Sequence, residues 1–381
     1  MVRELSRNTY SDLAAGEPAA HRKLSDAAFL AALVTFEREL AHAAAEAGLI
    51  VTAEAEQGIR TIDGVELDLD TLSRESVAGA NPAIPLVTAL RAVDPTGIHV
   101  GATSQDAIDT ALMICLRDAV ADLLGDVDRL AGDLADLARA HRDTPMIART
   151  LGQQATPTTF GCVAANWWQG IDAARTSLSD LEFPVQYAGA SGNLTSAFPH
   201  GIAVHEALAA RTDLASRPLV WHTDRSPVVR IAAALVQLTG AVSKIAGDIV
   251  ALSAGEVGEV REPSPGGSSA MPHKANPAAS VAARGYALRA PGLAATLFQS
   301  MDQRHQRADG AWHAEWQTVR ELAAVSASAL ARLGAAVDGL AVDTGRMAEN
   351  LAACPTGDQN PGHAAELVDL IVNEPDNERR L

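Results

Sequence analysis

One stretch of the chain repeats apolar residues at steps of three and four over many helical turns. It runs from about Gln105 to Arg142, and its apolar positions are Ile108, Leu112, Cys115, Ala119, Leu123, Val127, Leu130, Leu134 and Leu137. This period places the side chains on one face of a helix. The stretch predicts one long amphipathic helix, or two helices stacked end to end. Helices of this length need partners of similar length, which favours a bundle with coiled-coil-like packing.

Other parts of the chain share this helical periodicity. Ser25 and Asp26 precede one run that extends to about Gly48, and four more runs are Ala155 to Ser177, Val228 to Ser253, Pro277 to Gln303 and Glu315 to Asn350. Several exceed the usual helix length of about 11 or 12 residues. Aromatic residues make up only 4% of the chain, and no run alternates apolar and polar residues over the length of a strand. We therefore expect an all-α fold, although a non-enzymatic coiled coil would show the same periodicity.

The charge balance limits the partners that this chain is expected to bind. Its formal net charge is -17 and its pI is about 5.0, so it should repel nucleic acid and anionic membranes. No stretch approaches the roughly 18 consecutive apolar residues of a membrane span, and the N-terminus lacks the basic-then-apolar order of a signal peptide. We expect a cytoplasmic protein that binds neither nucleic acid nor membranes. The three scattered cysteines indicate neither a disulfide framework nor a metal site.

Gly and Pro interrupt the helical pattern, and three interruptions carry unusual polar clusters. The first runs from His99 to Asp106, immediately before the long helix. Thr103, Ser104 and Asp106 are all helix-capping residues, so a helix start alone explains them. The functional alternative is a seat for a carboxylate, made of hydroxyls and free backbone N–H groups at the helix N-terminus. His99 either adds a donor to this seat or is an ordinary helix-entry histidine.

The second interruption runs from Ala148 to Gly161. Gly152 and Pro157 predict a turn here. Side-chain donors are dense in this short segment, which would suit a ligand rich in oxyanions; they are Arg149, Thr150, Gln153, Gln154, Thr156, Thr158 and Thr159.

The third interruption, Glu262 to Pro277, reads EPSPGGSSAMPHKANP. Its Pro, Gly and Ser content predicts a loop between two helices. A flexible linker would explain that composition, but a linker has no need of Met-Pro-His-Lys followed by Asn-Pro. A serine in this loop could transfer a proton if backbone N–H groups and Lys274 stabilised its alkoxide.

These three segments, in this order on a helical chain, resemble the signature regions of the fumarase/aspartase superfamily. The loop pattern Gly-Ser-Ser-x-Met-Pro-x-Lys-x-Asn-Pro is matched at every fixed position from Gly267 to Pro277. The resemblance covers nearly the whole chain and implies a three-domain fold. Its parts are an N-terminal helical domain over residues 1–100, a central long-helix bundle over 101–340 that carries the loop, and a short C-terminal helical domain over 341–381. It also implies a homotetramer whose active sites are each shared by three subunits.

The resemblance assigns roles residue by residue. Ser268 matches the catalytic loop serine that exchanges a proton with the carbon next to a substrate carboxylate. Lys274 and Asn276 match residues that bind that carboxylate and stabilise the aci-carboxylate dianion formed from it. The implied catalytic residues are thus Ser268 and Lys274, and the expected substrate contacts are His99, Thr103, Ser104, Gln105, Arg149, Thr150, Gln153, Asn276 and Arg307. No metal or organic cofactor is implied.

The second region departs from many lyases of the superfamily. Those enzymes carry Arg-Thr-His-Gly-Gln, whereas this chain has Leu151 at the position of the histidine. Leucine cannot transfer a proton. The 3-carboxy-cis,cis-muconate cycloisomerase branch also lacks the histidine, and this chain is similar to it over the runs Gln153 to Gly161 and Gly310 to Trp316.

The resemblance to this branch implies lactonisation of the tricarboxylate 3-carboxy-cis,cis-muconate to 4-carboxymuconolactone, a step in protocatechuate breakdown by the β-ketoadipate route. Trp312 and Trp316 are expected to be structural or substrate-shaping. Ala275, at a loop position that is often basic in this branch, and the short C-terminal domain are departures from the pattern. The alternatives are an adenylosuccinate-lyase-like β-elimination enzyme and an inactive helical scaffold.

Overall fold

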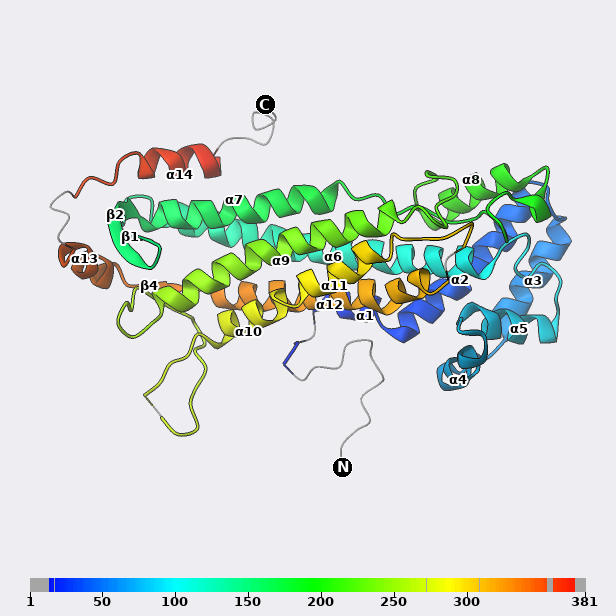
Figure 1. Ribbon diagram of the computed structural model, residues 1–381, viewed down its shortest axis with the longest axis horizontal. Coiled ribbons are helices and arrows are strands. Elements are labelled where there is room, and N and C mark those ends of the chain that lie inside the picture. The colour runs from blue at the N-terminus through cyan, green and yellow to red at the C-terminus, as the bar shows by residue number, and fades with distance from the viewer. Residues whose placement is uncertain (1–13, 17, 272, 308, 355–358, 374–381) are drawn as a thin grey trace.

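The long helices of this protein run side by side along its longest axis (Figure 1). The computed structural model describes residues 14–16, 18–271, 273–307, 309–354 and 359–373. Short helices from the first part of the chain lie at one end of the bundle. Two small pairs of antiparallel strands, a helix and the loop over residues 262–277 lie at the opposite end.

The bundle is built around α6, Ser104–Ala140, a single helix of 37 residues. At 1.5 Å per residue it is about 55 Å long. The apolar face predicted from the sequence is buried along α6, apart from the half-buried Leu137. The expected long helix is therefore confirmed as one continuous element. Its main neighbours are α2 (Asp26–Glu46), α7 (Phe160–Ser179) and α12 (Ala311–Val337).

The remaining bundle helices pack around α9. Their bounds are Ser226–Leu252 for α9, Ala278–Ala287 for α10 and Ala290–Gln299 for α11. The sequence predicted a helical pattern from Pro277 to Gln303, and the structure divides this stretch into α10 and α11. The helix breaks between Ala287 and Ala290, and Pro291 lies in the first turn of α11, where its missing N–H costs nothing.

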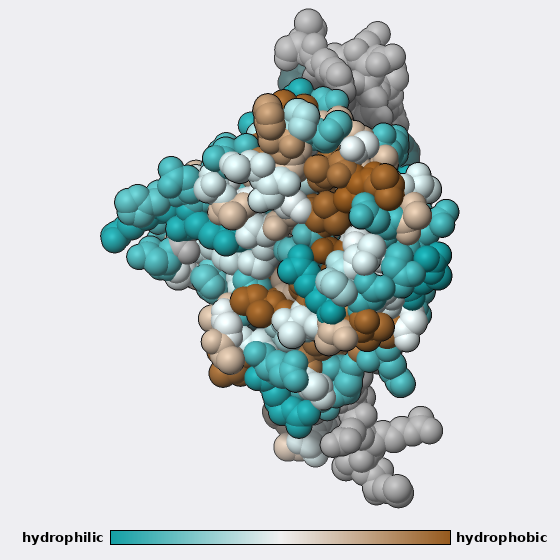
Figure 2. Space-filling view, turned by 90° about the vertical axis from the view of Figure 1, so that its right-hand side faces the viewer, coloured by the Kyte–Doolittle hydropathy of each residue, from teal (hydrophilic) through white to brown (hydrophobic). Residues whose placement is uncertain are grey.

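The other short elements come from residues 19–93 and 195–212, and most of them lie at the end of the bundle where α6 begins. They are α1 (Ala19–Lys23), α3 (Thr52–Gly64), α4 (Leu69–Gly79), α5 (Ala83–Val93), the 3-10 helix η1 (Thr195–Ala197) and α8 (Gly201–Thr212). Ser25 caps α2 by accepting a hydrogen bond from the N–H of Ala28, at the start of the run that the sequence predicted. Figure 2 looks onto this end and shows apolar side chains in several patches among hydrophilic ones. Phe198 and Ile202 are exposed apolar residues of this region.

Two antiparallel pairs of strands lie at the far end, and the first of them is a hairpin. Strand β1 (Pro145–Thr150) pairs with β2 (Gln153–Thr159), and β3 (Val260–Arg261) pairs with β4 (Ala341–Val342). The first hairpin replaces the start of the helix predicted from Ala155, so α7 begins only at Phe160. Leu151 and Gly152 form its two-residue turn, both with positive φ, as a type I′ turn requires. The local pattern concealed this hairpin because its turn lacks the usual Asn-Gly or Asp-Gly pair.

The helix predicted from Glu315 to Asn350 is also interrupted. Helix α12 ends at Val337, Asp338 adopts an extended conformation, and β4 separates α12 from α13 (Thr344–Ala352). The helical pattern is broken where β4 pairs with β3. The last described helix, α14 (Ala364–Asn373), packs on α7. The mainly helical fold class is confirmed, while the domain limits at residues 100 and 340 stay predictions.

Helix α9 is the one helix among the described residues that is long and apolar enough to cross a membrane by composition. Half of its most apolar window is buried inside this chain. It packs on α7, α10, α11 and α12, as a core helix of a bundle does.

Candidate functional site

The turn at the N-terminus of α6 brings four of the predicted residues together. Arg307, from the segment before α12, donates a hydrogen bond of 2.5 Å to the hydroxyl of Thr103. It also lies 3.4 Å from the hydroxyl of Ser104 and 3.4 Å from the side-chain oxygen of Gln105. Two segments 204 positions apart in the chain therefore meet at one turn.

Arg307 is a half-buried cation without a close counter-ion. Burial lowers the pKa of its guanidinium, against the opposing effect of Asp106 and Asp109, but an arginine stays charged at physiological pH. Over the part of the chain that the structure describes, no carboxylate lies within ion-pairing distance of this guanidinium. A guanidinium without a counter-ion beside the N-terminus of a long helix can bind an anion.

Asp106 holds this turn from the inside of the protein. Its buried carboxylate accepts hydrogen bonds from the backbone N–H groups of Thr103, Ala188 and Gly189 at 3.0, 3.1 and 3.0 Å. His222 contacts the same carboxylate at 2.7 Å. The capping role predicted for Asp106 is confirmed, and the carboxylate also ties the turn to the segment before η1.

A second layer of buried charge lies one helical turn further along α6. Arg225 is held between Asp109, at 2.9 and 3.0 Å, and Glu315, at 2.6 to 3.0 Å. The indole N–H of Trp312 donates to Asp109 at 2.9 Å, so Trp312 has a structural contact, as expected. Sequence analysis missed Asp109, Arg225, Glu315 and His222. The sequence offered one sign of this buried layer, because Asp109 is a charged residue that lies beside the apolar positions of an amphipathic helix.

Gln105 belongs partly to this buried layer. Its side chain is fully buried and donates to the backbone carbonyl of His222 at 2.9 Å. Its oxygen remains within reach of Arg307. His99, on the segment before α6, lies 2.6 Å from the buried carboxylate of Glu37.

The predicted residues of the second region lie on the β1–β2 hairpin. Arg149 donates to both carboxylate oxygens of buried Glu259, at 2.8 and 2.7 Å. Thr150 and Gln153 lie opposite each other at the end of the hairpin, and both are exposed. Leu151 at the tip is fully exposed. Thr150 and Gln153 can therefore reach a ligand beyond the tip, whereas the guanidinium of Arg149 is already paired.

The third region forms a loop whose two ends are joined by backbone hydrogen bonds. Gly266 and Asn276 exchange bonds of 2.8 and 2.9 Å, and the amide of Asn276 donates to the carbonyl of Gly267 at 3.3 Å. Inside the loop, the hydroxyl oxygen of Ser268 accepts from the backbone N–H of Met271 at 3.1 Å and from that of Ala270 at 3.4 Å. This is the donor arrangement that stabilises an alkoxide. Lys274 is exposed on the same loop.

The three regions do not meet within one chain. About 50 Å of α6 separates Gln105 from the end of the helix that leads into β1. In Figure 1 the start of α6 lies at one end of the molecule, while the hairpin and the loop over residues 262–277 lie at the other. A site that uses all three regions must therefore contain more than one copy of the chain.

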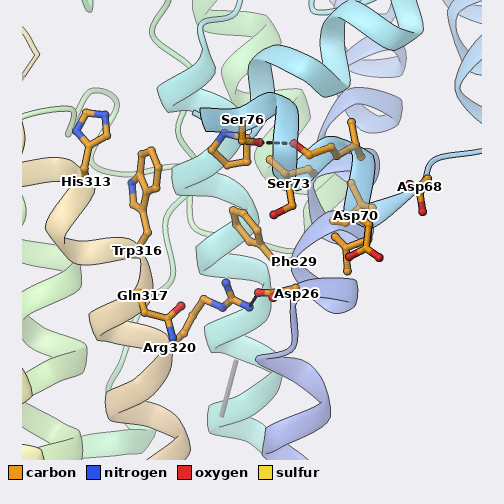
Figure 3. A pocket seen from close by; sticks show the side chains of 15 residues that line it. Asp26, Phe29, Asp68, Asp70, Ser73, Ser76, His313, Trp316, Gln317 and Arg320 are labelled. Atoms are coloured by element: carbon orange, nitrogen blue, oxygen red, sulfur yellow. Dashed lines mark hydrogen bonds and ion pairs between the residues drawn. The ribbon is translucent and has the colours of Figure 1, made fainter. Parts of the chain in front are cut away.

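Two cavities differ in whether predicted site residues line them. One of about 620 Å³ lies at the base of the loop and is lined by Asn276 among others. Another, of about 850 Å³, lies between α2, α4 and α12, and none of the predicted site residues lines it. Figure 3 shows Trp316 and Phe29 beside this cavity, together with the ion pair between Arg320 and Asp26.

Comparison with known proteins places these features in a family. The model of a family described as lyase matches residues 19–292. The chain is 40% identical to nitrosuccinate lyase of Streptomyces davaonensis, over 90% of this chain and 76% of the relative. It is 38% identical to 3-carboxy-cis,cis-muconate cycloisomerase of Pseudomonas putida, over 88% of this chain and 82% of the relative.

A solved structure shows the same fold. The crystal structure of 3-carboxy-cis,cis-muconate lactonizing enzyme from Pseudomonas putida superposes with a TM-score of 0.84 and 34% sequence identity. The match covers 96% of this chain and 87% of that one.

Proposed function

This chain belongs to the lyase family of the fumarase/aspartase superfamily, and we propose that it is a cycloisomerase that converts 3-carboxy-cis,cis-muconate to 4-carboxymuconolactone in protocatechuate catabolism. The observation that carries the proposal is the hydroxyl of Ser268, which faces two backbone N–H groups in a loop of the superfamily pattern. The relatives named as cycloisomerases of this substrate support it.

The proposed reaction is an internal addition. One carboxylate oxygen of the substrate bonds to an alkene carbon, and the electron pair of the diene moves to the carbon next to a second carboxylate. Ser268 gives that carbon a proton, and its alkoxide is stabilised by the N–H groups of Ala270 and Met271 until solvent returns the proton. Every atom of the substrate stays in the product, so neither an oxidant nor a reductant takes part.

The exposed Leu151 agrees with this chemistry. A β-elimination that expels a basic leaving group benefits from an acid that protonates it. The group that departs in the reverse of the lactonisation is a carboxylate, which is already a stable anion. A residue without a proton to transfer at the tip of the hairpin therefore favours the cycloisomerase over an adenylosuccinate-lyase-like enzyme.

A tricarboxylate substrate needs local positive charge on an acidic protein. We assign this role first to Arg307, whose guanidinium has no close counter-ion among the described residues, and to Lys274 on the loop. Thr103, Ser104, Thr150, Gln153 and Asn276 would add neutral donors. Arg149 would contribute mainly by holding the hairpin, because Glu259 already occupies its guanidinium.

We further propose a cytoplasmic homotetramer with each active site shared by three subunits. The separation of the first region from the other two along α6 supports a shared site. Exposed apolar side chains support association of the bundles; they are Val281 on α10, Phe298 on α11 and Leu288 between the two helices. These side chains are exposed to water in a single chain.

Purified protein incubated with 3-carboxy-cis,cis-muconate tests the activity through the loss of ultraviolet absorbance as the conjugated diene disappears. Nitrosuccinate and adenylosuccinate serve as parallel substrates, since a relative at 40% identity is named nitrosuccinate lyase. Turnover of the muconate far above the other two supports the proposal. Turnover of nitrosuccinate or adenylosuccinate alone would replace lactonisation by β-elimination as the function of this chain.

A further inference from the structure

We propose that Glu37 is a positioning residue that holds His99 as an imidazolium, and that this cation contacts a carboxylate of the substrate, so that substrate affinity falls as the pH rises. The inference rests on the proposed function, because it takes the ligand to be a polycarboxylate bound at the N-terminus of α6. It adds to that function a residue on α2 and a pH dependence of binding.

The contact between the two side chains is short and buried. The Nδ1 atom of His99 lies 2.6 Å from one carboxylate oxygen of Glu37, whose side chain is fully shielded from water. The other carboxylate oxygen of Glu37 is buried and has no hydrogen-bond partner among the described residues. An ionised carboxylate in such a place is costly unless its one partner carries a positive charge. The geometry thus favours a charged histidine.

The second nitrogen of the ring is left for a ligand. With Nδ1 bound to Glu37, Nε2 of the imidazolium is the remaining donor. No hydrogen bond joins Nε2 to any residue in the described part of the chain. The side chain of His99 keeps an exposed fraction of 11%, so it is not sealed from the solvent.

The backbone around His99 is built in an unusual way. His99 has a φ of 56°, in the left-handed region that few non-glycine residues adopt. Gly101 follows with a φ of 67°, and an added Cβ there would lie 2.4 Å from the hydroxyl of Tyr187. Strained conformations persist where the surrounding structure imposes them, and they gather at functional sites. Here the strain presents the imidazole ring to Glu37, four residues before Thr103.

Charged groups on three helices act on this imidazole. Burial lowers the pKa of His99, Glu37 on α2 and Asp106 on α6 raise it, and Arg91 on α5 lowers it; the net effect is a raised pKa. The imidazolium therefore persists to a higher pH than that of a free histidine. As the pH rises through this pKa, His99 loses its charge and its attraction for an anionic ligand.

The test compares Glu37→Gln with Glu39→Gln. The first change keeps the shape of the side chain and removes its charge. The control lies two residues further along α2, where Glu39 pairs with Arg211 instead. Tricarballylate, an unreactive tricarboxylate, is the probe, and calorimetry measures its affinity between pH 5 and pH 9. Titration of ¹³C-labelled histidine by NMR follows the protonation of His99 in the same samples.

For Glu37→Gln we expect the pKa of His99 to fall by at least about one unit. At a pH above the wild-type pKa, the protonated fraction of His99 should then fall about tenfold. Tricarballylate should bind about tenfold more weakly at neutral pH and return towards wild-type affinity near pH 5. Glu39→Gln should match the wild type throughout. A merely structural role for Glu37 would weaken binding equally at every pH, with the titration of His99 unmoved.

A second variant, His99→Gln, keeps a neutral donor and cannot be charged. Its affinity for tricarballylate should be low and independent of pH over the range in which the wild type changes. The inference is overturned if Glu37→Gln and the wild type share one affinity profile, or if His99→Gln binds like the wild type. These measurements need no turnover, so failure of the muconate assay and failure of this inference are distinct results.

Discussion

Arg149 and Glu259 are joined by two hydrogen bonds of 2.8 and 2.7 Å, which tie the β1–β2 hairpin to the segment that leads into β3. The side chain of Glu259 is fully buried, whereas that of Arg149 keeps an exposed fraction of 25%. The amide of Asn350, on α13, donates to the same carboxylate at 2.8 Å. The second signature region is thus anchored within a few residues of the loop that carries Ser268.

The unequal burial of this pair predicts unequal costs for its two partners. Arg149→Met leaves the buried carboxylate of Glu259 without its cation and should lower the free energy of unfolding by about 3–5 kcal/mol. Glu259→Gln leaves a guanidinium that can reach water and should cost less. Urea unfolding of both variants measures the difference. Equal losses, or a larger loss for Glu259→Gln, would contradict this account of the pair.

The proton-transfer role of Ser268 predicts a specific loss of rate. Ser268→Ala should reduce kcat by at least about 10²-fold, the usual contribution of a positioned proton donor, while the circular dichroism spectrum and assembly stay unchanged. Ser269→Ala is the matched control, because that neighbouring hydroxyl makes no hydrogen bond within the described residues. Loss of activity in the control with retention in Ser268→Ala would transfer the role to Ser269.

Sharing of the active site between subunits predicts complementation. Ser268→Ala and Arg307→Ala should each be nearly inactive alone, because one lacks the proton donor and the other the cation at the α6 turn. Co-expressed chains with two different affinity tags should regain activity in the doubly purified assembly. Each mixed assembly then contains some sites built from an intact loop and an intact turn. Mixed assemblies as inactive as either parent would place both groups in a site made by one chain.

The buried layer behind the turn predicts a pH dependence of stability. Burial raises the pKa of Glu315 from 4.5 to about 7, against the effect of Arg225. Between these two values the folded protein binds more protons at Glu315 than the unfolded chain does. The contribution of this carboxyl to stability is therefore full below pH 4.5 and is lost as the pH rises through about 7.

Glu315→Gln removes this titration and should reduce the fall in unfolding free energy between pH 5 and pH 8. Glu321→Gln, which changes a partly exposed partner of Arg289 on the same helix, should leave that fall as in the wild type. Urea unfolding at the two pH values makes the comparison. If the unfolding free energy of Glu315→Gln fell between the two pH values as much as that of the wild type, other groups would carry the pH dependence of stability.

The sequence predicted the elements that depend on neighbouring residues. The period of α6 and the start of α2 after Ser25 were correct, because both depend on residues at most a few positions apart. The β1–β2 hairpin and the break between α10 and α11 were missed. Each depends on how the chain packs at the end or side of the bundle, and a window of helical residues carries no record of that packing.

The sequence by itself determined the long helices and the loop that carries Ser268, since periodicity, capping and the run of Gly, Ser and Pro act locally along the chain. Only the tertiary structure decided which polar groups meet. His99 with Glu37, Arg149 with Glu259 and Arg307 with Thr103 are pairs 62, 110 and 204 positions apart. Their meeting depends on the packing of whole helices, so no local pattern could show that Arg149 has a carboxylate partner while Arg307 contacts only neutral side chains among the described residues.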